Sequence, residues 1–263
     1  MKTARLCTTA IGLIALGFTT NCYADRVLGL YAGGGIWSAS LDGSVGADAT
    51  PVTTDELGYS SAQNTFAFVA FEHLVPVIPN IRLAVTDLGL TSSASISREF
   101  IFEGLTIPAD AATTSEIDLS HTDVTLYYQI LDNYLSFDIG LTGRTFDGFA
   151  NIDYTTEATD ELPAVTEGES IKLDGTIPMI YSMLQVDLPL TGWYAGASLN
   201  FIGFDGDSFS DIDAKIGYMT NGLVLDFGFD LGYREMSLTI KELTDLNADI
   251  SASGPYASIF AHF

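Results

Sequence analysis

The sequence predicts an all-β protein: a closed antiparallel β-barrel that crosses a membrane with its strands, preceded by a cleaved export signal. Three observations lead to this prediction. The 263-residue chain begins with a short apolar leader, has no later apolar run long enough for a membrane helix, and alternates apolar and polar residues over long stretches. Only helices and closed barrels satisfy every backbone polar group within lipid.

The first 24 residues have the three regions of a secretory signal peptide. Lys2 and Arg5 precede an apolar run at 10–18, and small residues end the segment at Ala24. That run is shorter than the roughly 20 residues that a membrane helix needs. We therefore divide the chain into a signal peptide, 1–24, and an outer-membrane β-barrel, 25–263.

Both cysteines, Cys7 and Cys22, lie in the leader, so the remaining chain has no thiol chemistry. The residues before Cys22 are Thr-Thr-Asn, whereas a lipoprotein signal has Leu and small residues there. Without the leader, eight of the ten basic residues remain against 34 acidic ones. This balance argues against nucleic acid as a partner.

Strict alternation identifies the strands and their two faces. In 135–144, Leu, Phe, Ile and Leu occupy one face, while Ser, Asp, Gly, Thr and Arg occupy the other. The longest apolar run after the leader, 66–71, has six residues, which excludes helical spans. Ten strands are predicted, at 28–41, 60–73, 80–92, 117–130, 134–148, 172–187, 193–204, 209–219, 222–240 and 249–263.

The connections between these strands alternate in length. Short ones are predicted at 74–79, 131–133, 189–192 and 220–222, and longer acidic ones at 42–59, 93–116, 149–171 and 241–248, with a short exception at 205–208. Bacterial outer-membrane barrels have an even strand number, short periplasmic turns and longer external loops. Ten strands on this plan place both chain ends in the periplasm of a Gram-negative cell.

Aromatic residues flank the proposed periplasmic turns at Tyr128, Tyr134, Trp193 and Tyr218, as in an interfacial aromatic girdle. The chain ends on Phe263 after alternating apolar residues, a pattern typical of the signal that the barrel-assembly machinery reads. The expected partners are therefore this machinery, outer-membrane lipid and lipopolysaccharide.

Several segments resemble a family of predicted gammaproteobacterial (Vibrio-like and Shewanella-like) outer-membrane β-barrel proteins. They are E-H-L-V-P-V-I-P-N-I-R-L at 72–83, D-L-S-H-T-D-V-T-L-Y-Y-Q-I-L-D-N at 118–133, F-D-G turns at 146–148 and 204–206, and G-P-Y at 254–256. Leu74 departs from the proline usual there. The family has no established activity, so the resemblance implies the fold and location and no catalytic residue.

Charged residues on the inward faces are predicted to form a network in the lumen. A barrel of about eight to ten strands has an interior that side chains largely fill. We expect acids such as Asp138, Asp226 and Asp230 to pair with Arg144, Lys215 and Arg234. The candidate network consists of Asp138, Arg144, Asp213, Lys215, Asp226, Asp230 and Arg234. The alternative that stays open is a pathway or binding site for a small polar solute.

Two further motifs contain residue types found in functional sites but do not predict one. Ser120, His121 and Asp123 supply the residue types of a hydrolase, but adjacent strand residues point to opposite faces. Barrel proteases of similar strand number carry Asp and His pairs at the external rim, and the predicted external loops contain no histidine.

The acids Asp205, Asp207, Asp211 and Asp213 supply oxygen ligands for calcium but miss the EF-hand spacing. The triplet at 33–35 reads as a bend or tight packing in the first strand. No catalytic, cofactor or metal site is predicted.

The sequence thus favours an integral outer-membrane barrel, structural or a narrow passive porin-like channel for small polar solutes, without catalysis. The alternative is a barrel with a ligand-binding or hydrolytic site at its extracellular mouth. A soluble β-sandwich is disfavoured because one face of the strands is continuously apolar.

The leader generates the first prediction. Mass spectrometry of the protein purified from native membranes should give Asp25 as its first residue, because the signal ends on small residues. A chain that retains Met1, or one acylated at Cys22, would contradict this.

Overall fold

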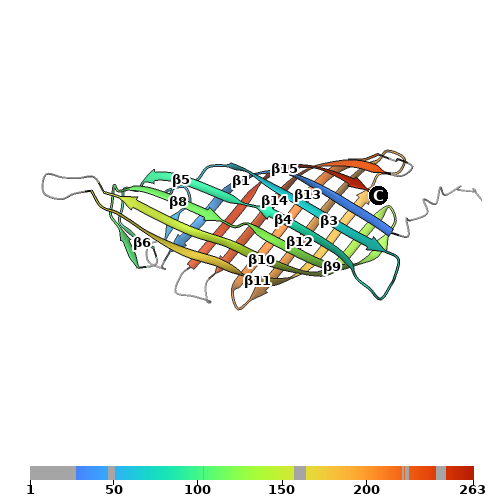
Figure 1. Cartoon of the computed structure of the whole chain (residues 1–263), viewed down its shortest axis with the longest axis horizontal. Helices are drawn as coiled ribbons and strands as arrows, with labels where there is room; N and C mark the ends of the chain where they lie inside the picture. The colour runs from blue at the N-terminus through green and yellow to red at the C-terminus, as the bar shows by residue number, and fades with distance from the viewer. Residues whose placement is uncertain are drawn as a thin grey trace, which may run out of the picture.

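Strand pairing closes the sheet on itself in the computed structural model (Figure 1). The structure describes residues 28–46, 51–102, 104–156, 164–220, 222, 225–240 and 247–263. The predicted signal peptide and its cleavage site lie outside these ranges. The strands are β1 (Leu28–Gly46), β2 (Val52–Thr53), β3 (Ala62–His73), β4 (Asn80–Asp87), β5 (Gly89–Ser95), β6 (Phe100–Phe102), β7 (Leu105–Ile107), β8 (Ala112–Asp118), β9 (His121–Asp132), β10 (Leu135–Thr155), β11 (Thr166–Asp187), β12 (Trp193–Phe204), β13 (Asp207–Met219), β14 (Asp226–Ile240) and β15 (Asn247–His262).

The wall has ten strands, which confirms the predicted closed antiparallel barrel. Every pairing is antiparallel, and β10 with β11 joins the two ends of the strand order. Two wall strands are interrupted. β4 and β5 are separated by Leu88, and β8 and β9 by Leu119 and Ser120.

The long-loop end of the barrel reaches further than the sequence predicted. β10 and β11 pair from Leu135 with Val186 up to Thr155 with Thr166, although strands were predicted only at 134–148 and 172–187. The predicted F-D-G turn at 146–148 is wrong, because these residues lie inside β10. A Cβ on Gly148 would lie 2.1 Å from the Asp118 carbonyl oxygen, so this glycine allows close approach of β8.

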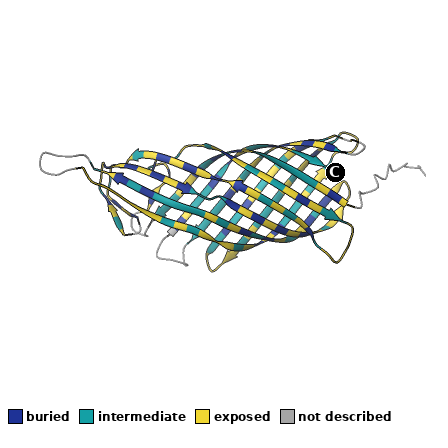
Figure 2. Ribbon diagram, in the orientation of Figure 1, coloured by how far each residue is buried: buried dark blue, intermediate teal, exposed yellow. Residues whose placement is uncertain are grey.

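The two faces of the wall follow the predicted alternation, visible as alternating buried and exposed bands in Figure 2. Outward residues form an apolar belt, with large exposed side chains such as Val69, Leu83, Leu126, Ile139, Leu141, Ile180, Ile216, Phe227, Leu231 and Ile259. Towards the long loops, the outward positions turn polar, at Ser38, Thr65, Asp87, Thr122, Thr145, Ser210, Glu235 and Ser253. The barrel therefore continues well beyond its belt at that end.

The short-turn end carries the predicted aromatic residues. The Trp193 ring contacts those of Tyr218 and Phe229, with centroids 5.3 and 5.9 Å apart. The Tyr128 hydroxyl donates to the Val77 carbonyl at 3.1 Å, which holds the turn 74–79 against the wall. These contacts fit amphipathic rings at a membrane interface.

Two glycine-containing segments behave as the sequence suggested. Asp205 and Gly206 form the two-residue connection between β12 and β13, with φ of 50° and 94°. Positive φ at both residues is typical of a tight hairpin turn. The triplet at 33–35 packs tightly inside β1, since a Cβ on Gly35 would lie 2.2 Å from the Ala257 carbonyl oxygen.

No helix among the described residues is long and apolar enough to span a membrane.

The belt can be tested by charge placement on β14. Leu231 faces outward within the belt, and Ser237 lies on the same strand and face beyond it. Leu231→Arg should lower the free energy of unfolding in lipid vesicles by about 2–4 kcal/mol, as arginine does near the bilayer midplane of a barrel. Ser237→Arg should have little effect. Equal urea midpoints for the two variants would show that the belt does not face lipid.

Candidate functional site in the lumen

Two arginines and two aspartates form a buried ion-pair layer inside the barrel. The Arg144 guanidinium donates to both Asp123 oxygens at 2.8 and 2.7 Å and to Asp211 Oδ2 at 2.6 Å. Arg234 donates to both Asp211 oxygens at 2.9 and 2.6 Å. One carboxylate, that of Asp211, is therefore shared by two arginines.

The layer spans the lumen because its members come from separated wall strands. Arg144 lies on β10 and Asp211 on β13, with β11 and β12 between them. On β14, Arg234 donates to Thr86 Oγ1 of β4 at 3.3 Å and contacts His121 Nε2 of β9 at 3.4 Å. Side chains from opposite walls thus meet at one level of the barrel.

Burial makes the pairing of these charges obligatory. Arg144 is 1% exposed and Asp211 is 5% exposed. An isolated charge in such an environment is very costly, whereas bidentate arginine–carboxylate bonds offset much of the desolvation. Both guanidiniums also lie over aromatic rings, Arg234 4.7 Å from the Trp37 centroid and Arg144 5.4 Å from that of Phe209.

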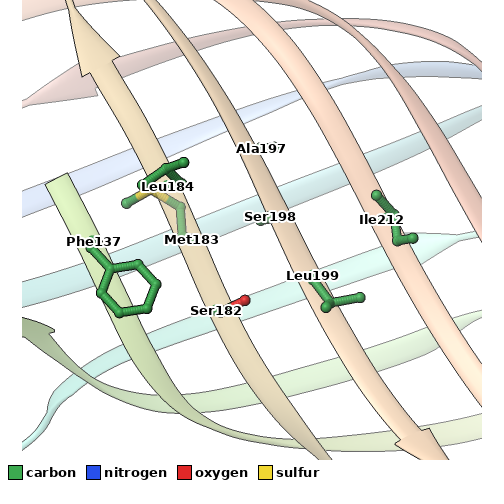
Figure 3. A pocket seen from close by; sticks show the side chains of 8 residues that line it. All are labelled: Phe137, Ser182, Met183, Leu184, Ala197, Ser198, Leu199 and Ile212. Carbon is green, nitrogen blue, oxygen red and sulfur yellow. The ribbon is translucent and has the colours of Figure 1, made fainter. Parts of the chain in front are cut away.

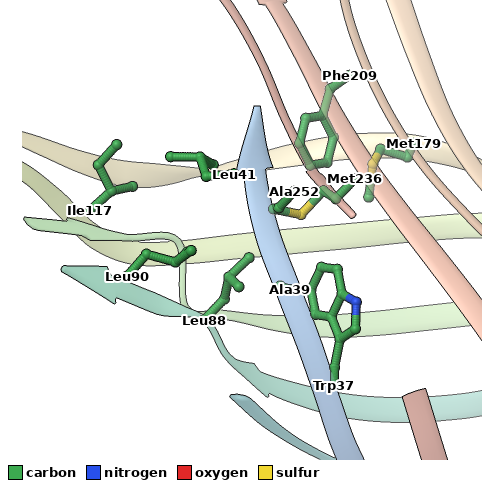
Figure 4. Packing of buried hydrophobic residues seen from close by; sticks show 10 residues of the cluster. All are labelled: Trp37, Ala39, Leu41, Leu88, Leu90, Ile117, Met179, Phe209, Met236 and Ala252. Carbon is green, nitrogen blue, oxygen red and sulfur yellow. The ribbon is translucent and has the colours of Figure 1, made fainter. Parts of the chain in front are cut away.

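An apolar cluster, whose side chains Figure 4 shows, contacts the arginines of the ion-pair layer through Trp37, Phe209 and Met236. Its members are Trp37, Ala39, Leu41, Leu88, Leu90, Ile117, Met179, Phe209, Met236 and Ala252. Met236 joins the two groups, since its sulfur is 3.5 Å from Arg144 Nη1. Five of these side chains (Trp37, Ala39, Leu88, Leu90 and Ala252) are at most 1% exposed. We call this group the throat cluster.

A second set of polar contacts lies towards the short-turn end. Lys215 Nζ donates to Asp230 Oδ2 at 3.3 Å, and the Tyr194 hydroxyl donates to Asp230 Oδ1 at 2.5 Å. Asp213 accepts hydrogen bonds from Ser198 and, at 3.0 Å, from the Tyr256 hydroxyl. In this set, hydroxyl groups donate most of the hydrogen bonds that the two carboxylates accept, and Lys215 donates one.

The remaining members of the predicted network lie apart from the arginines. Asp226 lies near the short-turn end, where its carboxylate is 3.7 Å from His262 Nδ1 and accepts from the Gly222 amide at 2.5 Å. Asp138 is 1% exposed, and its Oδ1 has no hydrogen-bond partner among the described residues. Arg82, another inward cation, lies 4.7 Å from the Phe68 ring centroid.

The pairings differ in part from those expected from the sequence. Lys215 does contact Asp230, but Arg234 binds Asp211, and Arg144 binds Asp123 and Asp211 in place of Asp138. Asp211 was missing from the predicted network, although it shares the inward parity of Asp213 on the same strand. The inward parity of Asp211 is therefore the sequence signal that would have identified it.

The set-aside motifs are also separated in the structure. Ser120 Oγ contacts Asp87 Oδ1 at 3.4 Å and accepts from the Leu88 amide, whereas His121 Nδ1 contacts the Leu119 carbonyl at 2.8 Å. Of the acids rejected as calcium ligands, Asp211 lies in the ion-pair layer, where its carboxylate binds two arginines. Among the described residues, no group of three or more acidic, histidine or cysteine side chains is arranged to hold a metal.

Hollows indent the described part of the wall, and two of them are lined as follows. One of about 230 Å³ lies on the belt over β10 to β13 (Figure 3), lined by Phe137, Ser182, Met183, Leu184, Ala197, Ser198, Leu199 and Ile212. The other, of about 700 Å³, is lined by Thr65, Phe66, Ala67, Val85, Thr86, Asp87, Ser120, His121, Thr122, Thr145 and Asp147. Both are lined largely by outward-facing residues.

Comparison with known proteins places the fold. No protein-family model matches the chain, and no curated protein matches it. The structure is similar to that of the outer membrane protease OmpT from Escherichia coli, at 9% identity and a TM-score of 0.53, covering 89% of this chain and 97% of that chain. The chain has the fold of an outer-membrane β-barrel.

Two further solved structures align at lower TM-scores. Ail, the attachment invasion locus protein of Yersinia pestis, shares 10% identity at a TM-score of 0.33, covering 90% of this chain and 100% of that one. The P. putida toluene transporter TodX shares 10% identity at a TM-score of 0.35, covering 91% and 90%.

The ion-pair layer predicts a specific pattern of stability. Arg144→Met should lower the free energy of unfolding by about 3–5 kcal/mol, because it leaves the Asp123 carboxylate buried without its guanidinium. Adding Asp123→Leu should restore part of that loss. Arg98→Met, which breaks an ion pair with Glu56 in which both side chains are 36% exposed, should cost about 1 kcal/mol or less. Urea unfolding measures all three, and equal losses for Arg144→Met and Arg98→Met would contradict the assignment.

Proposed function

We propose that this protein is an integral barrel of a Gram-negative outer membrane with a closed lumen and a structural, non-catalytic role. The observation that supports this proposal best is that two layers, the ion-pair layer and the throat cluster, fill the lumen. The guanidiniums of Arg144 and Arg234 cross it, and the throat cluster packs directly beside them.

A solute would have to disrupt both layers to pass. Breaking one partner of a buried ion pair costs about 3–5 kcal/mol. A polar solute entering the throat cluster would also lose hydration without finding hydrogen-bond partners there. The passive channel for small polar solutes, expected as one possibility from the sequence, is therefore less favoured by these contacts than the closed barrel.

The orientation in the membrane follows from the two ends. Short turns at 74–79, 133–134 and 188–192 fit the periplasmic side, and the opposite end, where β10 and β11 extend furthest, fits the cell exterior. On this arrangement both chain ends are periplasmic. Lipid and lipopolysaccharide contact the belt, and the barrel-assembly machinery reads β15 together with the terminal Phe263.

A ligand-binding role at the extracellular mouth is the second candidate. The favouring observation is that the wall continues beyond the belt, so the mouth forms a folded structure outside the membrane. A hydrolytic site there has less support, because Ser120 and His121 contact different groups.

Planar-bilayer recording of the refolded protein tests the closed lumen. The parent protein should give little or no current, because side chains fill the lumen. Opening both layers, in Arg144→Ala with Arg234→Ala and Trp37→Ala, should produce a measurable, cation-selective current, since Asp123 and Asp211 then line the opening. The belt variant Leu199→Ala should remain silent. A large selective current in the parent protein would overturn the closed barrel and favour the channel.

A further inference from the structure

The wall of the barrel is incomplete above the belt, between β1 and β5. β3 pairs with β1 only up to Ala62 opposite Ala39, and the ladder beside β1 resumes where Thr53 of β2 lies opposite Ser44. β5 pairs with β8 along one edge and has no ladder partner on the other within the described ranges. The Gly89 amide is instead bound by the Asn64 side chain at 3.1 Å.

Residues 51–59, here called the mouth segment, fill this gap with side-chain contacts. Val52 and Leu57 are 2% and 5% exposed and belong to a second apolar cluster. That cluster also contains Ile152 and Tyr154, which share the inward parity of Arg144 on β10. The mouth segment therefore folds into the barrel and closes its end.

The hairpin of β6 and β7 completes the closure. The second cluster, here called the mouth cluster, consists of Val52, Leu57, Ile96, Phe100, Phe102, Ile107, Ala111, Ile152 and Tyr154. Tyr59 packs against both the mouth cluster and the throat cluster. Apolar side chains are thus continuous from the mouth to the ion-pair layer.

One polar contact joins the mouth segment to the chain before β6. Arg98 donates from Nε and Nη2 to the two Glu56 oxygens, both at 2.9 Å, and from Nη2 to the Pro51 carbonyl at 2.6 Å. Glu56 also accepts from the Thr53 amide at 2.9 Å. Both charged side chains are 36% exposed, so water can replace their contact, unlike those of the ion-pair layer.

The ion pair of Arg98 and Glu56, here called the latch, is charged at neutral pH. Hydrogen bonds from Arg98 and the Thr53 amide hold the pKa of Glu56 at about 2, well below its usual range. The latch therefore persists at neutral and mildly acidic pH, where Glu56 is ionised. In this range the latch opens by movement of the mouth segment and not by protonation of Glu56.

We propose that the mouth segment is a gate, latched by Arg98 and Glu56, and that its opening exposes a binding site for a small apolar ligand. The ligand occupies the space that Leu57 and Tyr59 fill in the closed state. This inference rests on the proposed closed barrel, because the ion-pair layer then forms the floor of the site.

The ligand class follows from the lining. The two clusters offer aliphatic and aromatic side chains, which favour an apolar molecule and penalise a polar one. The surrounding chain is strongly acidic, with 34 acidic residues in all, which disfavours an anionic ligand. A neutral aromatic such as indole is a suitable probe.

Hydrogen exchange in nanodiscs tests the gate. The Thr54, Leu57 and Tyr59 amides bond to Gly43, Thr53 and Thr54 carbonyls, so they report opening. Arg98→Ala should speed their exchange several-fold and leave amides of 135–146 unchanged. The charge swap Glu56→Arg with Arg98→Glu should return exchange towards the parent rate. Acceleration spread evenly over the barrel, or none, would overturn the gate.

Indole binding, followed by saturation-transfer NMR, tests the site. When only the open state binds, the apparent affinity rises by the factor by which opening increases. Arg98→Ala should thus bind indole several-fold more tightly than the parent, and Leu57→Ala should too. Leu199→Ala, on the outer wall, should not. Unchanged binding in both mouth variants would overturn the site.

A disulfide provides a lock that does not depend on the latch. A Cβ on Gly58 would lie 3.4 Å from that of Ala94, near the range for a disulfide, and residues 25–263 have no native cysteine. Gly58→Cys with Ala94→Cys should lose indole binding when oxidised and regain it when reduced. The φ of 77° at Gly58 strains a cysteine at that position in both forms. The reduced double variant, and not the parent protein, is therefore the reference. Binding that persists in the oxidised form would overturn the gate.

These outcomes are separable from the proposed function. If the floor is intact, Arg98→Ala should bind indole yet remain silent in planar bilayers. A current in Arg98→Ala would refute the closed barrel, whereas silence without indole binding would refute only the gated site.

Discussion

The need to pair every backbone amide and carbonyl is the constraint on which the rest of this structure depends. A wall of strands whose outer face is apolar cannot leave an edge within lipid, so the sheet closes through β10 and β11. Closure with ten strands then fixes a narrow interior. Inward-facing side chains therefore contact one another across the lumen. The chemistry of the lumen depends on which of them lie at the same height along the barrel axis.

At one level the residues that meet are charged, and geometry selects their partners. Asp211 accepts from arginines on two different strands, so three wall strands are tied through one carboxylate. Such a cross-link adds to the closure made by backbone bonds, because the barrel cannot widen at this level without separating buried charges. Beyond the belt, where water surrounds the wall, the ladder tolerates a gap, and side chains of the mouth segment close it.

The sequence predicted the barrel, its strand number and both faces, because period-two alternation and loop lengths are local signals. It did not predict how far β10 and β11 extend, since their upper outward positions are largely polar and lack the contrast that marks a lipid-facing strand. The F-D-G segment at 146–148 was wrongly predicted as a turn, because the same motif can occur inside a strand. Glycine there accommodates β8, whereas Gly206 in the same motif turns the chain.

The partners of the two arginines could not be predicted from parity alone, because parity gives the face of a residue and strand register gives its height. Asp138 and Arg144 lie on the same face of β10, but Asp123 and Asp211 lie at the height of Arg144. Register across three intervening pairings is a property of the closed barrel. The same register places the apolar side chains together beyond the arginines, so that the lumen changes from polar to apolar along its axis. A uniform polar passage would need polar side chains at both heights.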